Sequence, residues 1–146
     1  MPAKELFYED IELGQELGPL ERVVSDDDVV AFVEVWLGNK GGVRFTDHEA
    51  ARKEGLPEAI VPGIMSMGIL SQFLTGLATN LTLNKLDVVF RQPVLHNRPL
   101  SVKGIVTDKS EVDGQGRLEL DVYIEDQAGE RPVGGTAVVT LPLRGS

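Results

Sequence analysis

Hydrophobic positions change their spacing about halfway along the chain. Up to about residue 78 they recur at helical spacing, and beyond it they alternate with polar residues, as in strands with one buried face. The alternation predicts four antiparallel strands after an earlier, weaker one at residues 20–24. They span residues 85–94, 100–110, 117–126 and 133–143, with turns predicted at 114–116 and 127–130.

The most hydrophobic helical segment covers residues 63–78. It carries no charge and is apolar almost all round, so we expect other structure to surround it on every face. Upstream, Ser25 and the three aspartates after it predict a capped helix that ends at Gly38. Asp47 predicts the cap of a short helix over 48–54, with Gly55 as its stop. Helices first and strands second predict an α+β fold, with a curved antiparallel sheet around the central helix.

Composition narrows the function classes. The 146 residues predict a single domain over 1–146. Lys and Arg number 14 against 23 Asp and Glu, a net charge of −9 that disfavours binding to nucleic acids or anionic lipid. The absence of cysteine excludes disulfides, thiolate metal sites and a thiol nucleophile. No secretory or membrane-spanning segment is visible, so we expect a cytoplasmic protein.

Three segments, in this order, resemble one family. They are SDDDVVAF from Ser25, IVPGIMSMGIL from Ile60 and VFRQPV from Val89. The chain resembles, over nearly its whole length, the MaoC-like or R-specific enoyl-CoA hydratase branch of the hotdog fold. The resemblance implies addition of water to a 2-enoyl thioester, or the reverse, with acyl-CoA as the substrate class.

The family's catalytic loop reads G-D-x-N-P-x-H, in which the Asp and the His activate one water. Anchored on Gly38, the Asp position is Asn39, the His position is Arg44, and the Asn-Pro pair becomes Gly41 and Gly42. Asn cannot act as a carboxylate base, and Arg stays protonated. The chain has no Asp-x4-His sequence to replace the motif. The loop is chemically suited to hold a phosphate or carboxylate, although its arginine has a structural ion pair as the alternative.

The substrate-binding part of the family pattern is retained. By resemblance, the N–H of Gly63 meets the thioester oxygen at the start of the central helix. Pro62 lacks an N–H but suits the beginning of a helix. Ser66, one turn further on, either lines an acyl pocket or bonds back to the preceding turn.

Other polar residues are weaker candidates. His48 either replaces the missing base or is an exposed histidine at a helix start. Glu58 is a second candidate for the missing base if its side chain points toward the start of the central helix. His96 is predicted to be a turn residue. Two histidines and scattered carboxylates have no metal-ligand spacing in the sequence, so we expect neither a metal site nor a cofactor.

Three functions remain open. The first is a hydratase or dehydratase with an altered dyad. The second is a non-catalytic hotdog subunit that binds an acyl thioester or pairs with an active homologue. The resemblance implies a homodimer, or a heterodimer with a second hotdog subunit. The third is a thioesterase, although no carboxylate lies between Glu58 and Asp87. The acidic chain disfavours an acidic carrier protein unless basic residues gather locally, the candidates being Arg91, Arg98, Lys103 and Lys109.

Overall fold

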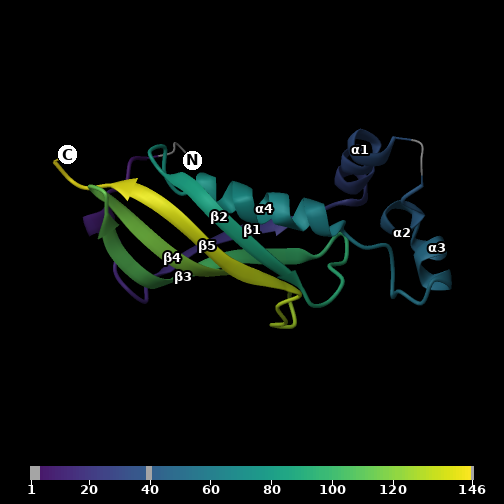
Figure 1. The fold of residues 1–146 in the computed structure, drawn as a ribbon. Coiled ribbons are helices and arrows are strands. Elements are labelled where there is room, and N and C mark those ends of the chain that lie inside the picture. The colour runs from purple at the N-terminus through teal and green to yellow at the C-terminus, as the bar shows by residue number, and fades with distance from the viewer. Residues whose placement is uncertain (1–3, 39–40, 146) are drawn as a thin grey trace.

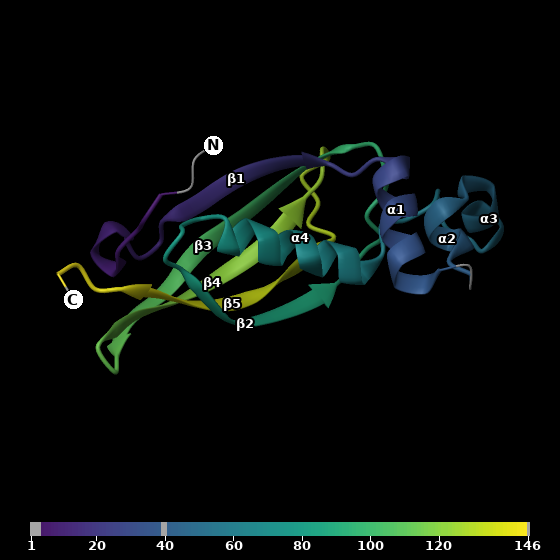
Figure 2. The same ribbon diagram turned by 90° about the horizontal axis from the view of Figure 1, so that it is seen from above.

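The computed structural model describes residues 4–38 and 41–145, and within them five strands form one antiparallel sheet. The strand order is β1-β3-β4-β5-β2, so β1 and β2 are the two edges. The sheet twists and curls around the helix α4, which lies along one of its faces (Figure 1 and Figure 2). The strands are β1 Glu16–Val23, β2 Thr82–Phe90, β3 Pro99–Val112, β4 Gln115–Glu125 and β5 Val133–Pro142.

The alternating pattern that predicted the strands sorts their side chains between the two faces. In β4, Leu118 and Leu120 are buried in the core, whereas Glu119 and Asp121 lie on the opposite face. Because successive side chains of a strand point to opposite faces, the same sorting runs through the neighbouring strands. The predicted α+β architecture is confirmed.

Several strand boundaries differ from the prediction, among them the start of β1, the end of β2 and the start of β4. Strand β2 ends at Phe90 rather than at residue 94. Pro93 lies beyond the hydrogen-bonded part of the strand, because proline has no N–H to donate to a neighbouring strand. The turn between β3 and β4 is centred on Asp113 and Gly114, with φ values of 53° and 77°. Two successive positive φ values suit a tight hairpin turn, so Gln115 already belongs to β4.

Helix α4 spans Gly63–Thr75 and packs against the concave side of the sheet (Figure 2). Its own residues Leu70, Phe73 and Leu74 are buried in the core between the helix and the sheet. The expectation that every face of this helix is covered is wrong, because Ile64 is 50% exposed and Met67 is 37% exposed. The sheet covers one side of the helix only. Among the described residues, no helix is both long enough and apolar enough to cross a membrane.

The remaining helices lie beyond one end of the sheet, next to the start of α4 (Figure 1). They are α1 Asp26–Leu37, α2 Val43–Thr46 and α3 His48–Lys53, and a 3-10 turn at Tyr8–Asp10 lies elsewhere, before β1. The predicted capping of α1 is confirmed, since Asp28 N–H donates to Ser25 Oγ at 3.1 Å. Asp47 likewise caps α3 by accepting the N–H of Ala50 at 3.1 Å.

Candidate functional site

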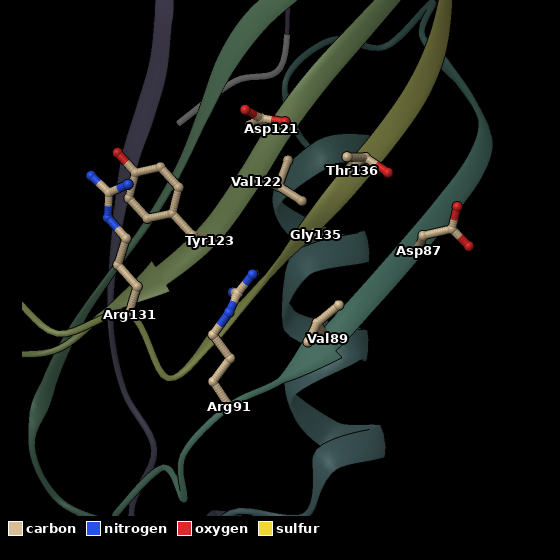
Figure 3. Close-up of a pocket in the computed structure, with 10 residues that line it drawn as sticks. Asp87, Val89, Arg91, Asp121, Val122, Tyr123, Arg131, Gly135 and Thr136 are labelled. Atoms are coloured by element: carbon tan, nitrogen blue, oxygen red, sulfur yellow. The ribbon is translucent and has the colours of Figure 1, made fainter.

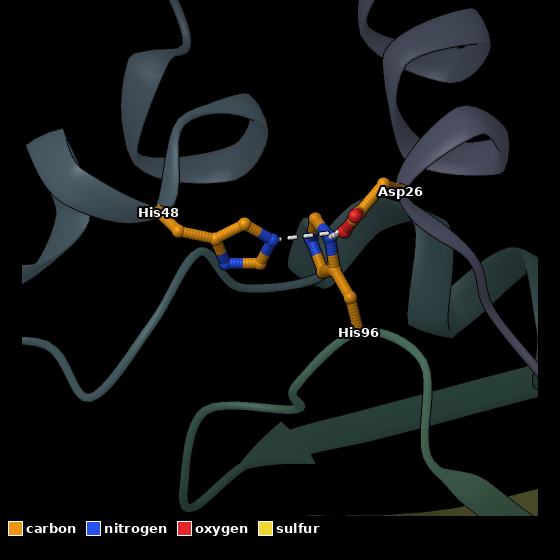
Figure 4. Close-up of side chains that lie close together, drawn as sticks. All are labelled: Asp26, His48 and His96. Carbon is orange, nitrogen blue, oxygen red and sulfur yellow. Dashed lines mark hydrogen bonds and ion pairs between the residues drawn. The ribbon is translucent and has the colours of Figure 1, made fainter.

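Two imidazoles and one carboxylate meet where α1 and α3 face the turn after β2 (Figure 4). Asp26 Oδ1 lies 2.9 Å from His48 Nε2 and 2.8 Å from His96 Nδ1. The side chains of Asp26 and His48 are 53% and 29% exposed, whereas His96 is 2% exposed. The cluster therefore presents a carboxylate and one imidazole to solvent and keeps the second imidazole inside the protein.

Local structure places each member of this cluster. The capping box makes Asp26 the first residue of α1, and the Asp47 cap makes His48 the first residue of α3. His96 lies in the turn between β2 and β3, where Asn97 adopts a φ of 64°. The Asn97 amide donates to Asp26 Oδ1 and accepts the Asp26 N–H, both at 3.1 Å. One asparagine thus fastens the turn that carries His96 to the start of α1.

The hydrogen bonds define which ring nitrogens carry protons. Ala59 N–H donates to His48 Nδ1 at 3.2 Å, so the proton of this ring is on Nε2 and is donated to Asp26. His96 donates Nδ1–H to the same oxygen, and its Nε2 has no hydrogen-bond partner among the described residues. These bonds, from His96 first and His48 second, hold the pKa of Asp26 below its ordinary value. Asp26 is therefore an anion at neutral pH.

Glu58 supports His48 from its other side. Glu58 Oε1 lies 3.7 Å from His48 Nδ1, and Glu58 Oε2 accepts a hydrogen bond from Arg98 at 2.5 Å. The Arg98 hydrogen bond is the main cause that lowers the pKa of Glu58. Because Arg98 keeps this carboxylate charged, Glu58 places a negative charge beside the His48 ring, whose Nδ1 accepts the Ala59 N–H.

A pocket of about 250 Å³ opens at the start of α4. The Pro62 carbonyl accepts hydrogen bonds from Met65 N–H and Ser66 N–H, at 3.0 and 3.1 Å. The N–H of a first helical residue has no partner in its own helix, so Gly63 N–H is available to a ligand. A Cβ at Gly63 would lie 3.2 Å from the Phe90 ring, so a side chain would crowd this entrance. Apolar residues supply most of the lining: Ile60, Val61, Phe90, Pro93, Val94 and Val133.

A short extended connection joins the cluster to this pocket. Ala59, whose N–H binds His48, is followed directly by the pocket residues Ile60 and Val61. Ile60 pairs in an antiparallel bridge with Leu95, and Leu95 directly precedes His96. The His48 ring is therefore hydrogen-bonded to the residue before Ile60, and His96 is two residues beyond the pocket residue Val94.

A larger hollow of about 350 Å³ lies on the sheet itself, over β2, β4 and β5 (Figure 3). Its lining carries charges of both signs, including Asp87, Asp121 and Arg91. Arg131 lies over the Tyr123 ring, 3.8 Å from the centroid. Asp121 and Tyr123 alternate with buried residues of β4, so this hollow is on the face away from α4. Since it contains neither histidine, it offers no imidazole for proton transfer.

The described residues of the family loop are not members of this cluster. Arg44 is exposed and donates a hydrogen bond to Glu54 at 2.9 Å. The predicted anion partner of Arg44 is therefore the carboxylate of Glu54, the C-cap residue of α3. Gly42 is the N-cap of α2 with a φ of 85°, and Gly41 precedes it with a φ of 109°. These values explain why the loop is rich in glycine. Asn39 lies outside the described residues.

Two members of the cluster were not among the predicted site residues. Asp26 was interpreted only as an acidic residue that favours a helix start, and His96 only as a turn residue. His96 is indeed in a turn, but its ring is buried against Asp26. Asp26 is 22 residues from His48 and 70 from His96 along the chain, so no local motif connects them.

No family model matches the chain, and no curated protein matches it. Several solved structures are similar in fold. The (R)-hydratase from A. caviae is 22% identical with a TM-score of 0.79, and the match covers 92% of this chain and 99% of that one. The MaoC-like dehydratase from Rhodospirillum rubrum is 20% identical with a TM-score of 0.82, over 97% and 99% of the two chains. The chain has the hotdog fold of these proteins.

A third similar structure is a complex of two different proteins. The ChsH1-ChsH2 complex from Mycobacterium tuberculosis contains a chain that is 15% identical to this one, with a TM-score of 0.74. That match covers 89% of this chain and 98% of the other. The same fold thus occurs in a protein that is assembled with a different partner.

Proposed function

We propose that this protein acts on acyl thioesters and adds water to, or removes water from, the carbon–carbon double bond next to the thioester. The observation that carries the proposal is the pair of Asp26 and His48, 2.9 Å apart and partly open to solvent, in which His48 accepts the N–H of Ala59, the residue before the pocket residue Ile60. The fold shared with an (R)-hydratase and a MaoC-like dehydratase supports the substrate class.

Asp26 supplies the acid–base chemistry in this proposal. Its carboxylate accepts a proton from water as the water oxygen bonds to the β-carbon, and the electron pair of the double bond moves toward the thioester carbonyl. Asp26 then returns the same proton to the α-carbon, so that one water is added in total. Such acid–base catalysis is typically worth about 10²–10⁴-fold in rate. His48 and His96 orient Asp26 through their N–H groups.

Gly63 and the apolar pocket account for binding. The Gly63 N–H, at the positive end of α4, stabilises the negative charge that develops on the thioester oxygen. The apolar lining receives the start of the acyl chain, and Ser66 lies one turn inside it. Asn39 and Arg44, the positions of the family dyad, have no part in proton transfer here, since neither amide nor guanidinium is a base.

The test is hydration of a short and a medium 2-enoyl-CoA by purified protein, followed by loss of enoyl absorbance, with a chelator present. We expect turnover by the pure protein, and a loss of about 10-fold or more in kcat for His48→Ala. His48→Gln retains a side-chain N–H donor and should keep more of the rate than His48→Ala. Absence of turnover with the pure wild-type protein would contradict the proposal.

A second function is favoured by a separate observation, the apolar surface beside the pocket. Val89 and Phe90 on the edge strand β2 are each about half exposed, at 51% and 49%, and Ile64 on α4 is exposed near them. A non-catalytic subunit would cover this surface with a second hotdog subunit that carries the complete dyad. Purification from the native source as a heteromer, with no hydration by this chain alone, would support this function over the first.

A further inference from the structure

The cluster of Asp26, His48 and His96 also has the composition of a metal site. Each side chain offers one ligand atom, and the three atoms lie within 4.8 Å of one another. They come from the first residue of α1, the first residue of α3 and the β2–β3 turn, so three separate elements converge on one point (Figure 4). The fold brings together ligands that have no metal-binding spacing in the sequence.

The chemistry of these donors selects the class of ion. Imidazole nitrogen with a carboxylate oxygen suits zinc and similar first-row divalent ions, whereas calcium and magnesium prefer oxygen ligands alone. Bonds of about 2.1 Å in tetrahedral geometry separate ligand atoms by about 3.4 Å. The Asp26 oxygen lies 2.9 and 2.8 Å from the two ring nitrogens, so binding requires them to move apart by only about half an ångström.

The metal-free cluster has features that an ion would relieve. Asp26 Oδ1 accepts from His48, His96 and Asn97 at once, which crowds three donors onto one oxygen. A divalent ion replaces the ring protons that point at Asp26 and adds positive charge to a chain of net charge −9.

The surroundings of His48 contain a carboxylate suited to the outer hydrogen bond that metal-bound histidines usually have. When Nε2 binds an ion, the ring proton moves to Nδ1, which then gives up the Ala59 N–H and turns to Glu58 Oε1, 3.7 Å away in the metal-free structure. Arg98 holds Glu58 in this position. A carboxylate that accepts the N–H of the nitrogen not bound to the metal orients the histidine ring and strengthens metal binding.

We propose that Asp26, His48 and His96 form a site for a divalent transition ion of the zinc class, with water in the remaining position. The site uses the same carboxylate as the proposed hydration, so a bound ion and acid–base catalysis by Asp26 exclude each other. Zinc should then inhibit hydration, and a chelator should restore it. Metal binding itself needs no substrate and does not depend on the proposed reaction.

The test uses full-length, tag-free protein stripped with a chelator and titrated with Co²⁺, followed by its visible absorption, and then with Zn²⁺ in competition. We expect one ion per chain, and binding at least about 10-fold weaker for Asp26→Asn, His48→Gln and His96→Gln. Glu58→Gln should weaken binding by about 10-fold. Asp27→Asn and Glu49→Gln, which alter neighbouring exposed carboxylates, should leave binding unchanged.

A measurement on the wild-type protein guards against variants that fail to fold. The chain contains two histidines, so a ring ¹H–¹⁵N spectrum reports on both of them directly. Zinc should shift the ring nitrogen signals of both histidines at one equivalent of metal. An unchanged spectrum, or Co²⁺ binding as tight in the three ligand variants as in Asp27→Asn, would overturn the site. Turnover in chelator would still support the proposed reaction, so the two proposals fail separately.

Discussion

The sheet with α4 and the segment from α1 to α3 are built in different ways. Side chains such as Leu70, Leu74 and Leu120 fill the space between sheet and helix and are wholly buried. The segment beyond the end of the sheet buries fewer apolar side chains, Val29 and Val33 among them, and is also held by the polar contacts of Asp26. If the proposed function holds, the first region mainly supplies stability and the second supplies the acid–base residues.

The largest effect on stability is expected in the core. Leu74→Ala should lower the free energy of unfolding by about 2–5 kcal/mol, because it removes buried methyl groups and leaves a cavity. Urea denaturation followed by circular dichroism measures this loss. Leu13→Ala is the matched control, since Leu13 is 66% exposed and its truncation should change stability by less than about 0.5 kcal/mol. Similar losses for the two variants would break the assignment of stability to the sheet and α4.

His96 should contribute more to the stability of the fold than His48 does. His96→Gln should lower the free energy of unfolding by about 1–3 kcal/mol, because it disturbs a buried hydrogen bond to Asp26. His48→Gln should cost about 1 kcal/mol or less, since His48 is open to solvent. The same denaturation experiment compares them. A larger loss for His48→Gln than for His96→Gln would contradict the view that His96 is the structural member of the cluster.

The smallest effect is expected at the position of the family histidine. Arg44→Ala should change the free energy of unfolding by less than about 1 kcal/mol, because its partner Glu54 is also exposed. The KM for a 2-enoyl-CoA should not change, since Glu54 already satisfies the guanidinium. Arg52→Ala, another exposed arginine of this segment, is the control. A clear rise in KM for Arg44→Ala alone would place a substrate anion at this loop.

The sequence predicted the features that depend on residues close together along the chain, and it missed those that depend on distant segments. The strands and the caps at Ser25 and Asp47 depend on neighbouring residues, and their prediction is confirmed. The exposed side of α4 was missed because an apolar sequence does not reveal how many faces the fold covers. The site could be predicted only in part: His48 was named as a weak candidate, but its contacts with Asp26 and His96 exist only after distant segments are folded together.

The measurement that tests the central claim most directly is the kcat for hydration of a 2-enoyl-CoA by Asp26→Asn and by Asp27→Asn. Both changes remove one charge from the first turn of α1, but only Asp26 contacts the two imidazoles. We predict a loss of about 100-fold or more for Asp26→Asn and a rate close to wild type for Asp27→Asn. Equal rates for the two variants would show that Asp26 is not the acid–base residue and that the polar cluster is structural.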